Sequence, residues 1–289
     1  MLLGCGKAGT TALWVALREG GHVCKCSPKE VGYFGRNFDE GPGWYSGQFR
    51  CCGGGGQAQA RATTATMDAS PANFRYFERI RATCALDGGY WCARLKMIMI
   101  LREPVARLLS MYNHKANFIR RGKKLQVSGF TADALGENGT VVSISQYAER
   151  VLEHEEGYGK DIPDKLEQFF QLFNRSQILI LSYVEWKASP GQVLKGRVLP
   201  FLGLGGDGGG GGEGKGAAWV NTNDSPDKLR RVPCSLQSRL AATFEGNNGR
   251  LYRLLDENPG PPMERRPFPR FELGPCQEDD DDDARTGTR

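Results

Sequence analysis

The chain has 289 residues, 39% of them hydrophobic, which is enough to bury a sizeable core in one large α/β domain or two small ones. Its 38 Lys and Arg against 33 Asp and Glu give a net charge of +5, and the acidic run Glu278–Asp283 hides part of the basic surplus. No apolar run reaches the length of a membrane-spanning helix. A basic body suits a polyanionic glycan, a nucleic acid or a nucleotide, although simple solubility explains the charge equally well.

Residues 2–13, LLGCGKAGTTAL, read as a short apolar strand, a glycine-rich loop around Lys7 and a helix that opens at Thr10. Glycines let backbone N–H groups turn toward an anion, the helix N-terminus adds partial positive charge, and Lys7 adds a full one. The spacing differs from the common nucleotide-triphosphate loop, because Lys7 precedes Gly9 instead of following the last glycine. The stretch predicts an anion-binding loop, with a turn that serves only packing as the alternative.

The following stretch places two ions, Lys29 and Glu30, beside several aromatic residues. Composition leaves two interpretations open for the ions, a catalytic role or a solvated surface pair. The aromatic residues are also candidates for ordinary core, namely Tyr33, Phe34, Trp44 and Tyr45. Further along, a short strand is predicted at Thr66, and a helix is predicted to begin at Pro71.

Residues 96–101, KMIMIL, are continuously apolar and predict a central parallel strand buried on both faces, with Arg102 at its carboxyl end. Ligands of open α/β sheets bind at the carboxyl ends of the strands, where the Lys7 loop should also lie. A kinase or nucleotide triphosphatase would be expected to place a magnesium-binding Asp there. Arg102 and Ser110, which lies on the next predicted helix, could instead hold a second phosphate. A structural salt bridge and a small residue at a helix crossing are the alternatives.

The remaining pattern alternates helices with one more buried strand. Helices are predicted over residues 143–155, with Ser143 or Ser145 as N-cap, and over 162–173, 190–204 and 235–257, and a strand over 177–183. This alternation predicts an α/β fold with a parallel sheet flanked by helices, in a single domain. We expect that domain to span residues 1–258, with glycine-rich insertions near 51–65 and 205–216, and residues 259–289 to form a disordered Pro-rich and acidic tail.

Nine cysteines are many for a cytosolic enzyme, and an odd number leaves at least one unpaired in a monomer. The pairs Cys24/Cys26 and Cys51/Cys52 lack the spacing of zinc ligands, so no metal site is predicted.

Asn-x-Ser/Thr sequons fit a secretory lumen, and they occur at Asn138, Asn174 and Asn223. Because Met1 falls almost directly on the first strand and no signal peptide precedes it, we expect a catalytic-domain fragment or an incomplete N-terminus.

Several ordered segments together resemble the sulfotransferases that use 3′-phosphoadenosine 5′-phosphosulfate (PAPS), in particular the Golgi carbohydrate branch with the heparan sulfate enzymes. The segments are GKAGTTAL, KEVGYF followed by GPGWYSGQF, MDASPANF and ILREPVARLLSMYNH, extended by KLEQFFQLFNRSQILILSYVEW and VLPFLGL. The resemblance covers roughly residues 2–257, and several motifs in one order are more specific than any loop alone.

The resemblance implies a donor site and a catalytic base. The 5′-phosphosulfate loop comprises Lys7, Ala8, Gly9, Thr10, Thr11 and Ala12. Arg102 and Ser110 match the pair that holds the 3′-phosphate, and Lys215 is a remnant of a later Lys-Gly-Arg loop that closes on the cofactor. Glu30 matches the base that deprotonates the acceptor, and Lys29 is assigned to neutralising the moving sulfonate. The resemblance also implies the Golgi lumen, a membrane anchor that this chain lacks, a glycan acceptor of either charge, and no nucleic-acid polymer as partner.

Two residues depart from the heparan 3-O-sulfating members, which often carry a histidine in place of Gly32 and a lysine in place of Ala69. These departures put the identity of the glycan in doubt, not that of the cofactor. Three alternatives stay open: an enzyme for small alcohols, amines or tyrosine, an inactive homologue that binds anionic glycans, and a P-loop kinase. The absence of an Asp after KMIMIL makes the kinase the least favoured of the three.

Overall fold

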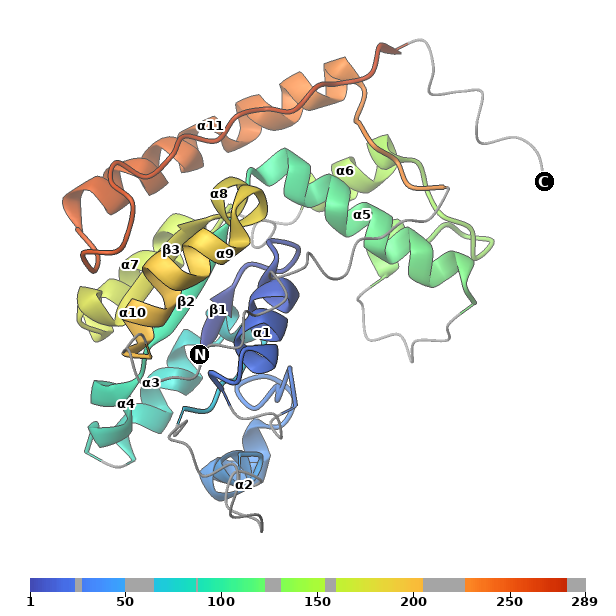
Figure 1. The fold of residues 1–289 in the computed structure, drawn as a ribbon. Coiled ribbons are helices and arrows are strands. Elements are labelled where there is room, and N and C mark those ends of the chain that lie inside the picture. The colour runs from blue at the N-terminus through green and yellow to red at the C-terminus, as the bar shows by residue number, and fades with distance from the viewer. Residues whose placement is uncertain are drawn as a thin grey trace. The chain divides into compact units, whose positions relative to one another are not determined.

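The computed structural model describes residues 1–23, 28–49, 65–86, 88–122, 131–153, 160–204 and 227–279 (Figure 1). Its contacts form two compact units. Unit 1 consists of Met1–Arg102, Lys165–Asn221 and Leu254–Pro269, and unit 2 of Glu103–Asp164, Thr222–Arg253 and Arg270–Arg289. The predicted domain limit at residue 258 coincides with neither unit, because both units take residues from beyond it.

Unit 1 contains a three-stranded parallel sheet in the order β1-β2-β3, formed by Leu2–Gly4, Met97–Leu101 and Ile178–Ser182. Every residue of these strands is buried, and β2 pairs with β3 in continuous register from Met97 opposite Ile178 to Leu101 opposite Ser182. Continuous apolar runs suit strands that are covered on both faces. The predicted parallel α/β fold is confirmed.

The described helices follow in chain order. They are α1 Thr10–Glu19, α2 Gly41–Gly47, α3 Phe77–Ala85, α4 Tyr90–Arg94, α5 Pro104–Arg120, α6 Ile144–Glu153, α7 Ile162–Leu172, α8 Tyr183–Ala188, α9 Pro190–Val193, α10 Leu199–Leu202 and α11 Cys234–Glu257 (Figure 1). Between α9 and α10 the helix widens into a π-helical turn, Leu194–Val198.

The strand predicted at Thr66 does not form. Residues 65–70 have no regular secondary structure, and the Asp68 carbonyl accepts one hydrogen bond from the Leu2 amide, 2.8 Å away. The Asp68 carboxylate then accepts from both the amide (2.9 Å) and the hydroxyl (2.6 Å) of Ser70. The next residue, Pro71, has no N–H and opens a 3-10 helix, Pro71–Arg75. The local turn ends the pairing with β1 before a ladder can develop.

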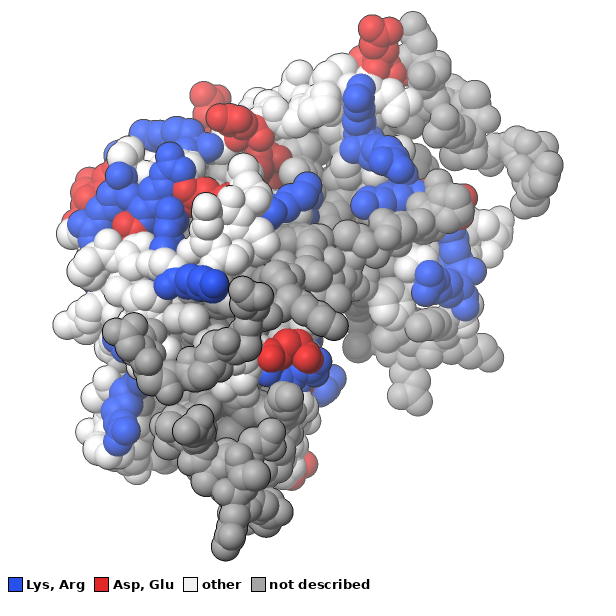
Figure 2. All heavy atoms as spheres, viewed as in Figure 1, with Lys and Arg blue, Asp and Glu red and all other residues white. Residues whose placement is uncertain are grey.

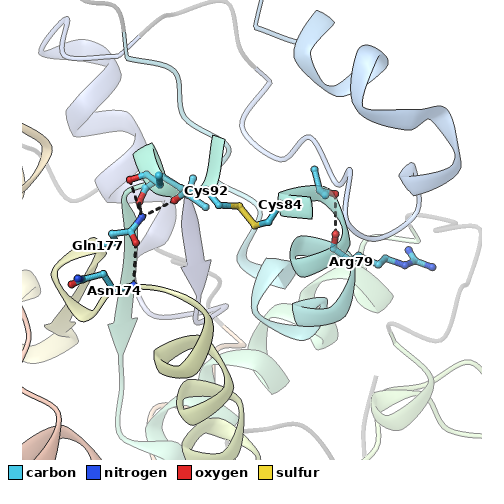
Figure 3. The surroundings of a disulfide bond; sticks show 8 residues. Arg79, Cys84, Cys92, Asn174 and Gln177 are labelled. Carbon is cyan, nitrogen blue, oxygen red and sulfur yellow. Dashed lines mark hydrogen bonds between the residues drawn. A yellow bond between two sulfur atoms is a disulfide. The ribbon is translucent and has the colours of Figure 1, made fainter. Parts of the chain in front are cut away.

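A disulfide and a glutamine side chain fix the segments that lead into β2 and β3 (Figure 3). Cys84–Cys92 joins α3 to α4 with a Cα–Cα distance of 5.4 Å. The Gln177 amide donates to the carbonyls of Cys92 (2.7 Å) and Leu95 (2.9 Å), immediately before β2. Its oxygen accepts from the Asn174 amide in a capping box that leads into β3. These contacts link the starts of the two strands.

The edge of β3 is covered by a carboxylate from the segment that was predicted to be disordered. Glu264 accepts from the Ile180 amide at 2.7 Å and from the Arg175 guanidinium at 2.5 Å, and both side chains are nearly buried. Figure 2 shows basic and acidic side chains intermixed over the end of α11 and the segment that follows it. The prediction of disorder is wrong for residues 259–279, because ion pairing, edge pairing and a disulfide (described below) fix them without periodic hydrophobicity.

Replacing Glu264 by alanine is expected to lower the free energy of unfolding by about 3–5 kcal/mol, because the Arg175 charge and the Ile180 amide lose a buried partner. Burial raises the pKa of Glu264 despite Arg175, and burial lowers that of Arg175, so charge burial is costly for both groups. Replacing both with methionine should therefore cost less than removing Glu264 alone. Urea unfolding measures this, and a loss equal to that of the exposed control Glu272→Ala would contradict it.

Unit 2 has its own core, built mainly from α5, α6 and the first part of α11, together with Ala134, Val142 and Val232 from the connecting segments. Its members are Val105, Leu108, Tyr112, Ala134, Val142, Ile144, Tyr147, Ala148, Val151, Val232, Leu236, Leu240 and Phe244. Glu103 caps α5 by accepting from the amides of Val105 (2.8 Å) and Ala106 (2.6 Å). Ser143 caps α6 by accepting from the Gln146 amide at 3.2 Å, as the sequence predicts.

A second disulfide, Cys234–Cys276, fixes the chain end of unit 2 against the start of α11 with a Cα–Cα distance of 4.9 Å. Pro233 and Gln277 form a parallel bridge beside it, in which Cys234 donates to the Gln277 carbonyl at 2.9 Å. The last described residues are thus part of a folded unit.

Candidate active site

The glycine-rich loop joins β1 to α1 and leaves the start of the helix open. Gly9 is the N-cap of α1 in the left-handed conformation (φ 86°), and no side chain caps the helix. The first amides of a helix lack partners within it, so an anion can bind them. In the described part of the chain, Lys7 alone combines a side chain with a positive φ, 66°. Such a conformation is uncommon outside glycine and is found preferentially at functional sites.

Arg102 contacts this loop directly. Its Nη1 donates to the Lys7 carbonyl at 2.7 Å, and its guanidinium carbon lies 4.4 Å from the centre of the Tyr183 ring. The hydrogen bond and the stacking hold the guanidinium beside the loop, so two cationic residues from the ends of β1 and β2 lie at one end of the sheet. Sequence reasoning missed Tyr183, although its position directly after β3 parallels that of Arg102 after β2.

The predicted donor roles stay predictions for every residue named, and two of the residues are not placed beside the loop. Ser110 is half-buried on α5 in unit 2, whereas Arg102 belongs to unit 1, so their joint action stays a prediction. Lys215 lies outside the described residues.

Lys29 and Glu30 form an ion pair with each other, with side-chain exposures of 21% and 54%. Two hydrogen bonds fix their turn: Lys29 accepts from the Ala69 amide at 2.9 Å, and the Gly32 amide donates to the Ser70 hydroxyl at 3.1 Å. The segment 68–70 therefore lies between this turn and β1, because its Asp68 carbonyl accepts from the Leu2 amide while Ala69 binds the turn.

The aromatic residues beside this turn are mostly core. Tyr33, Phe34 and Tyr45 are buried, and the Tyr33 and Tyr45 rings stack with centroids 4.5 Å apart. Trp44 is only half-buried. Val31, directly after Glu30, is also buried, so the chain on the C-terminal side of Glu30 is anchored while its carboxylate faces solvent.

A cavity of about 580 Å³ lies at the opposite end of the sheet. It is lined by Met1 and Leu95, which precede β1 and β2, and by Tyr45, Phe49, Asp68 and Trp91. The Asp68 carboxylate accepts from the Tyr45 hydroxyl at 3.1 Å, and burial, with this carboxylate, raises the pKa of Tyr45. Ligands of such sheets bind at the carboxyl ends of the strands, so the Lys7–Arg102 end is the better candidate.

Two absences hold for the part of the chain that the structure describes. No three His, Cys, Asp or Glu side chains cluster as a metal site would require. None of the described helices combines the length and apolar character needed to cross a bilayer.

Comparison with known proteins points to one family. The sulfotransferase domain model matches residues 1–211. The crystal structure of a sulfotransferase from Alicyclobacillus acidocaldarius is similar at 20% identity and a TM-score of 0.57, over 88% of this chain and 94% of that one. No protein with a curated description matches significantly. The structural likeness supports the fold, and the domain match supports the family. The chain, with its glycine-rich loop and Arg102 at one end of a parallel sheet, therefore belongs to the sulfotransferase domain family.

Proposed function

We propose that the chain transfers a sulfonate group from PAPS to a hydroxyl or amine of a carbohydrate acceptor. The family supplies the sulfotransferase activity and the donor. The observation that carries the proposed donor site is the 2.7 Å hydrogen bond from Arg102 to the Lys7 carbonyl, which brings two cationic residues to the open start of α1. PAPS has two separate phosphate positions, and two cationic residues beside a helix start that no side chain caps suit such a ligand.

In the proposed donor site, the 5′-phosphosulfate binds the glycine-rich loop and the first turn of α1. The residues concerned are Lys7, Ala8, Gly9 and residues 10–12. Arg102 is proposed to bind the 3′-phosphate as a charged fork, and the role of Ser110, which belongs to unit 2, as a hydroxyl donor stays a prediction. PAPS supplies a sulfonate on a phosphate leaving group. In this proposal Lys7 meets the negative charge that develops on that leaving group, and a positioned ammonium there lowers the barrier.

Glu30 is the proposed base. An exposed carboxylate can reach an acceptor hydroxyl or amine, accept its proton and leave the freed lone pair to attack sulfur in line. Lys29, now paired with Glu30, is positioned to neutralise the sulfonate as it moves. The ion pair supports roles for both residues in one step, because the acceptor that Glu30 deprotonates and the sulfonate that Lys29 neutralises meet at the bond being formed.

We also propose that the protein works in an oxidising secretory compartment, the Golgi lumen. The two disulfides support this, since such bonds persist mainly in oxidising compartments. Asn138 supports it as well, because it is an exposed sequon at the tip of a tight turn closed by the Gly136 and Thr140 hydrogen bonds. Asn174 is exposed but uses its side-chain oxygen to cap Ser176, and Asn223 lies outside the described residues.

The test is transfer of labelled sulfate from PAPS to a panel of desulfated glycans, small phenols and tyrosine peptides. Transfer to a glycan supports the proposal. Transfer only to phenols or peptides would favour an enzyme for small acceptors or tyrosine. Tight binding of adenosine 3′,5′-bisphosphate without transfer to any acceptor would favour the inactive glycan-binding alternative and overturn the catalytic roles.

A further inference from the structure

The segment that follows Glu30 presents one more cation, Arg36. A Cβ placed on Gly32 would lie 3.4 Å from Arg36 Nε and 3.7 Å from its Cζ, so the guanidinium folds back over the Gly32 backbone. Gly32 is in the left-handed conformation (φ 65°) and its amide binds the Ser70 hydroxyl. Arg36 therefore packs against Gly32, which follows Glu30 by two positions in the same turn.

The backbone around Arg36 is rigid, which makes this placement reproducible. The Gly32 carbonyl accepts from the amides of Gly35 (3.3 Å) and Asn37 (3.2 Å), and the Asn37 side chain donates to the Val31 carbonyl at 2.9 Å. Arg79 donates to the carbonyls of Phe34 (3.0 Å) and Gly35 (2.5 Å). The loop is thus fixed on both sides of Arg36, while the Arg36 side chain is exposed.

The neighbouring cations have partners within the protein, and Arg36 differs from them. Lys29 pairs with Glu30, and Arg79 binds two carbonyls and packs over the Phe38 ring. Among the described residues, no hydrogen bond or ion pair engages the Arg36 guanidinium. An exposed, preplaced guanidinium is well suited to bidentate binding of a carboxylate or sulfate.

We infer that Arg36 selects acceptors that carry an anionic substituent, a carboxylate or a sulfate, close to the group that receives the sulfonate. This inference rests on the proposed function of Glu30 as base. Arg36 acts in binding, because its fork holds the acceptor's anion, and it takes no part in proton transfer. Gly32 suits this turn because its left-handed φ of 65° is a backbone conformation that other residues rarely adopt.

The test compares Arg36→Ala and Arg36→Lys with the wild type and with Arg81→Ala, a control in an exposed ion pair that should have little effect. The acceptors are a uronate-bearing oligosaccharide, its carboxyl-reduced form, and an N-sulfated form of each. For anionic acceptors Arg36→Ala should raise KM about tenfold or more, with kcat within about twofold, because a charge-assisted hydrogen bond is lost. Arg36→Lys should recover part of the loss. KM for the fully neutral acceptor and the affinity for adenosine 3′,5′-bisphosphate should not change.

Comparing the uronate-bearing acceptor with the N-sulfated, carboxyl-reduced acceptor identifies whether Arg36 binds the carboxylate or the sulfate. Equal KM changes for anionic and neutral acceptors, or no change for either, would overturn the inference while leaving the transferase function intact. Calorimetric binding of the same oligosaccharides, with adenosine 3′,5′-bisphosphate present, provides a readout that needs no turnover. If the wild type transfers no sulfonate but binds anionic oligosaccharides through Arg36, the proposed function fails and the binding role stands. If such binding is independent of Arg36, the inference fails on its own.

Discussion

Replacing Lys7 by alanine is expected to lower kcat for sulfonate transfer on the order of 10²–10³-fold, because the leaving phosphate loses the ammonium that meets its developing charge. Alanine keeps a Cβ at φ 66°, so the backbone cost of the left-handed conformation is unchanged. The Arg102 hydrogen bond goes to the Lys7 carbonyl, which the substitution also leaves in place. The measurement is the initial rate at saturating PAPS and acceptor.

Two controls distinguish a local electrostatic effect from a general one. Lys187→Ala removes an exposed ammonium from α8 of the same unit and should leave kcat unchanged. Lys7→Arg keeps the charge in a different shape and should recover part of the rate. A Lys7→Ala enzyme within about threefold of the wild-type kcat would contradict the electrostatic role, since a positioned donor is worth far more.

Replacing Glu30 by glutamine is expected to lower kcat by about 10²–10⁴-fold, because the amide cannot accept the acceptor's proton. The affinity for adenosine 3′,5′-bisphosphate should not change, since the proposed donor site lies in the Lys7 loop. Glutamine has nearly the same shape as glutamate, so steric effects are small. The measurement is single-turnover transfer to the best acceptor of the panel.

The free energy of unfolding of Glu30→Gln distinguishes a loss of catalysis from a loss of structure. Glu30 is 54% exposed and its ion pair with Lys29 is a surface pair, which contributes about 0–1 kcal/mol. Urea unfolding of Glu30→Gln should therefore match the wild type closely. Glu40→Gln, an exposed carboxylate on the same segment, is the matched control and should retain full activity. Equal losses in the two variants would remove Glu30 from the mechanism.

The sequence predicts best those elements of the fold that a local pattern of apolar residues or glycines determines. The apolar runs KMIMIL and QILILSY became the buried parallel strands β2 and β3, because strands covered on both faces need continuous apolar residues. The glycine-rich stretch became a loop with Gly9 as a left-handed N-cap. The placement of Arg102 beside Lys7 follows from the rule that the carboxyl ends of parallel strands share one edge.

Contacts between polar residues far apart in sequence could not be predicted. Glu264 reaches Arg175 and Ile180 across more than 80 positions, and such pairs leave no periodic signal. The stacking of Arg102 on Tyr183 and the folding of Arg36 over Gly32 are equally invisible in composition. The predicted strand at Thr66 failed because the Asp68 carboxylate binds Ser70 locally and competes with sheet pairing.

The most direct test of the donor site is the affinity of the wild type and of Arg102→Ala for adenosine 3′,5′-bisphosphate and for adenosine 5′-phosphate, measured by calorimetry. The proposed site predicts that the wild type prefers the bisphosphate by about 10–100-fold, which is the value of charge-assisted hydrogen bonds to the 3′-phosphate. Arg102→Ala should nearly abolish that preference. Equal affinities in the wild type, or an undiminished preference in Arg102→Ala, would contradict the placement of the 3′-phosphate at Arg102.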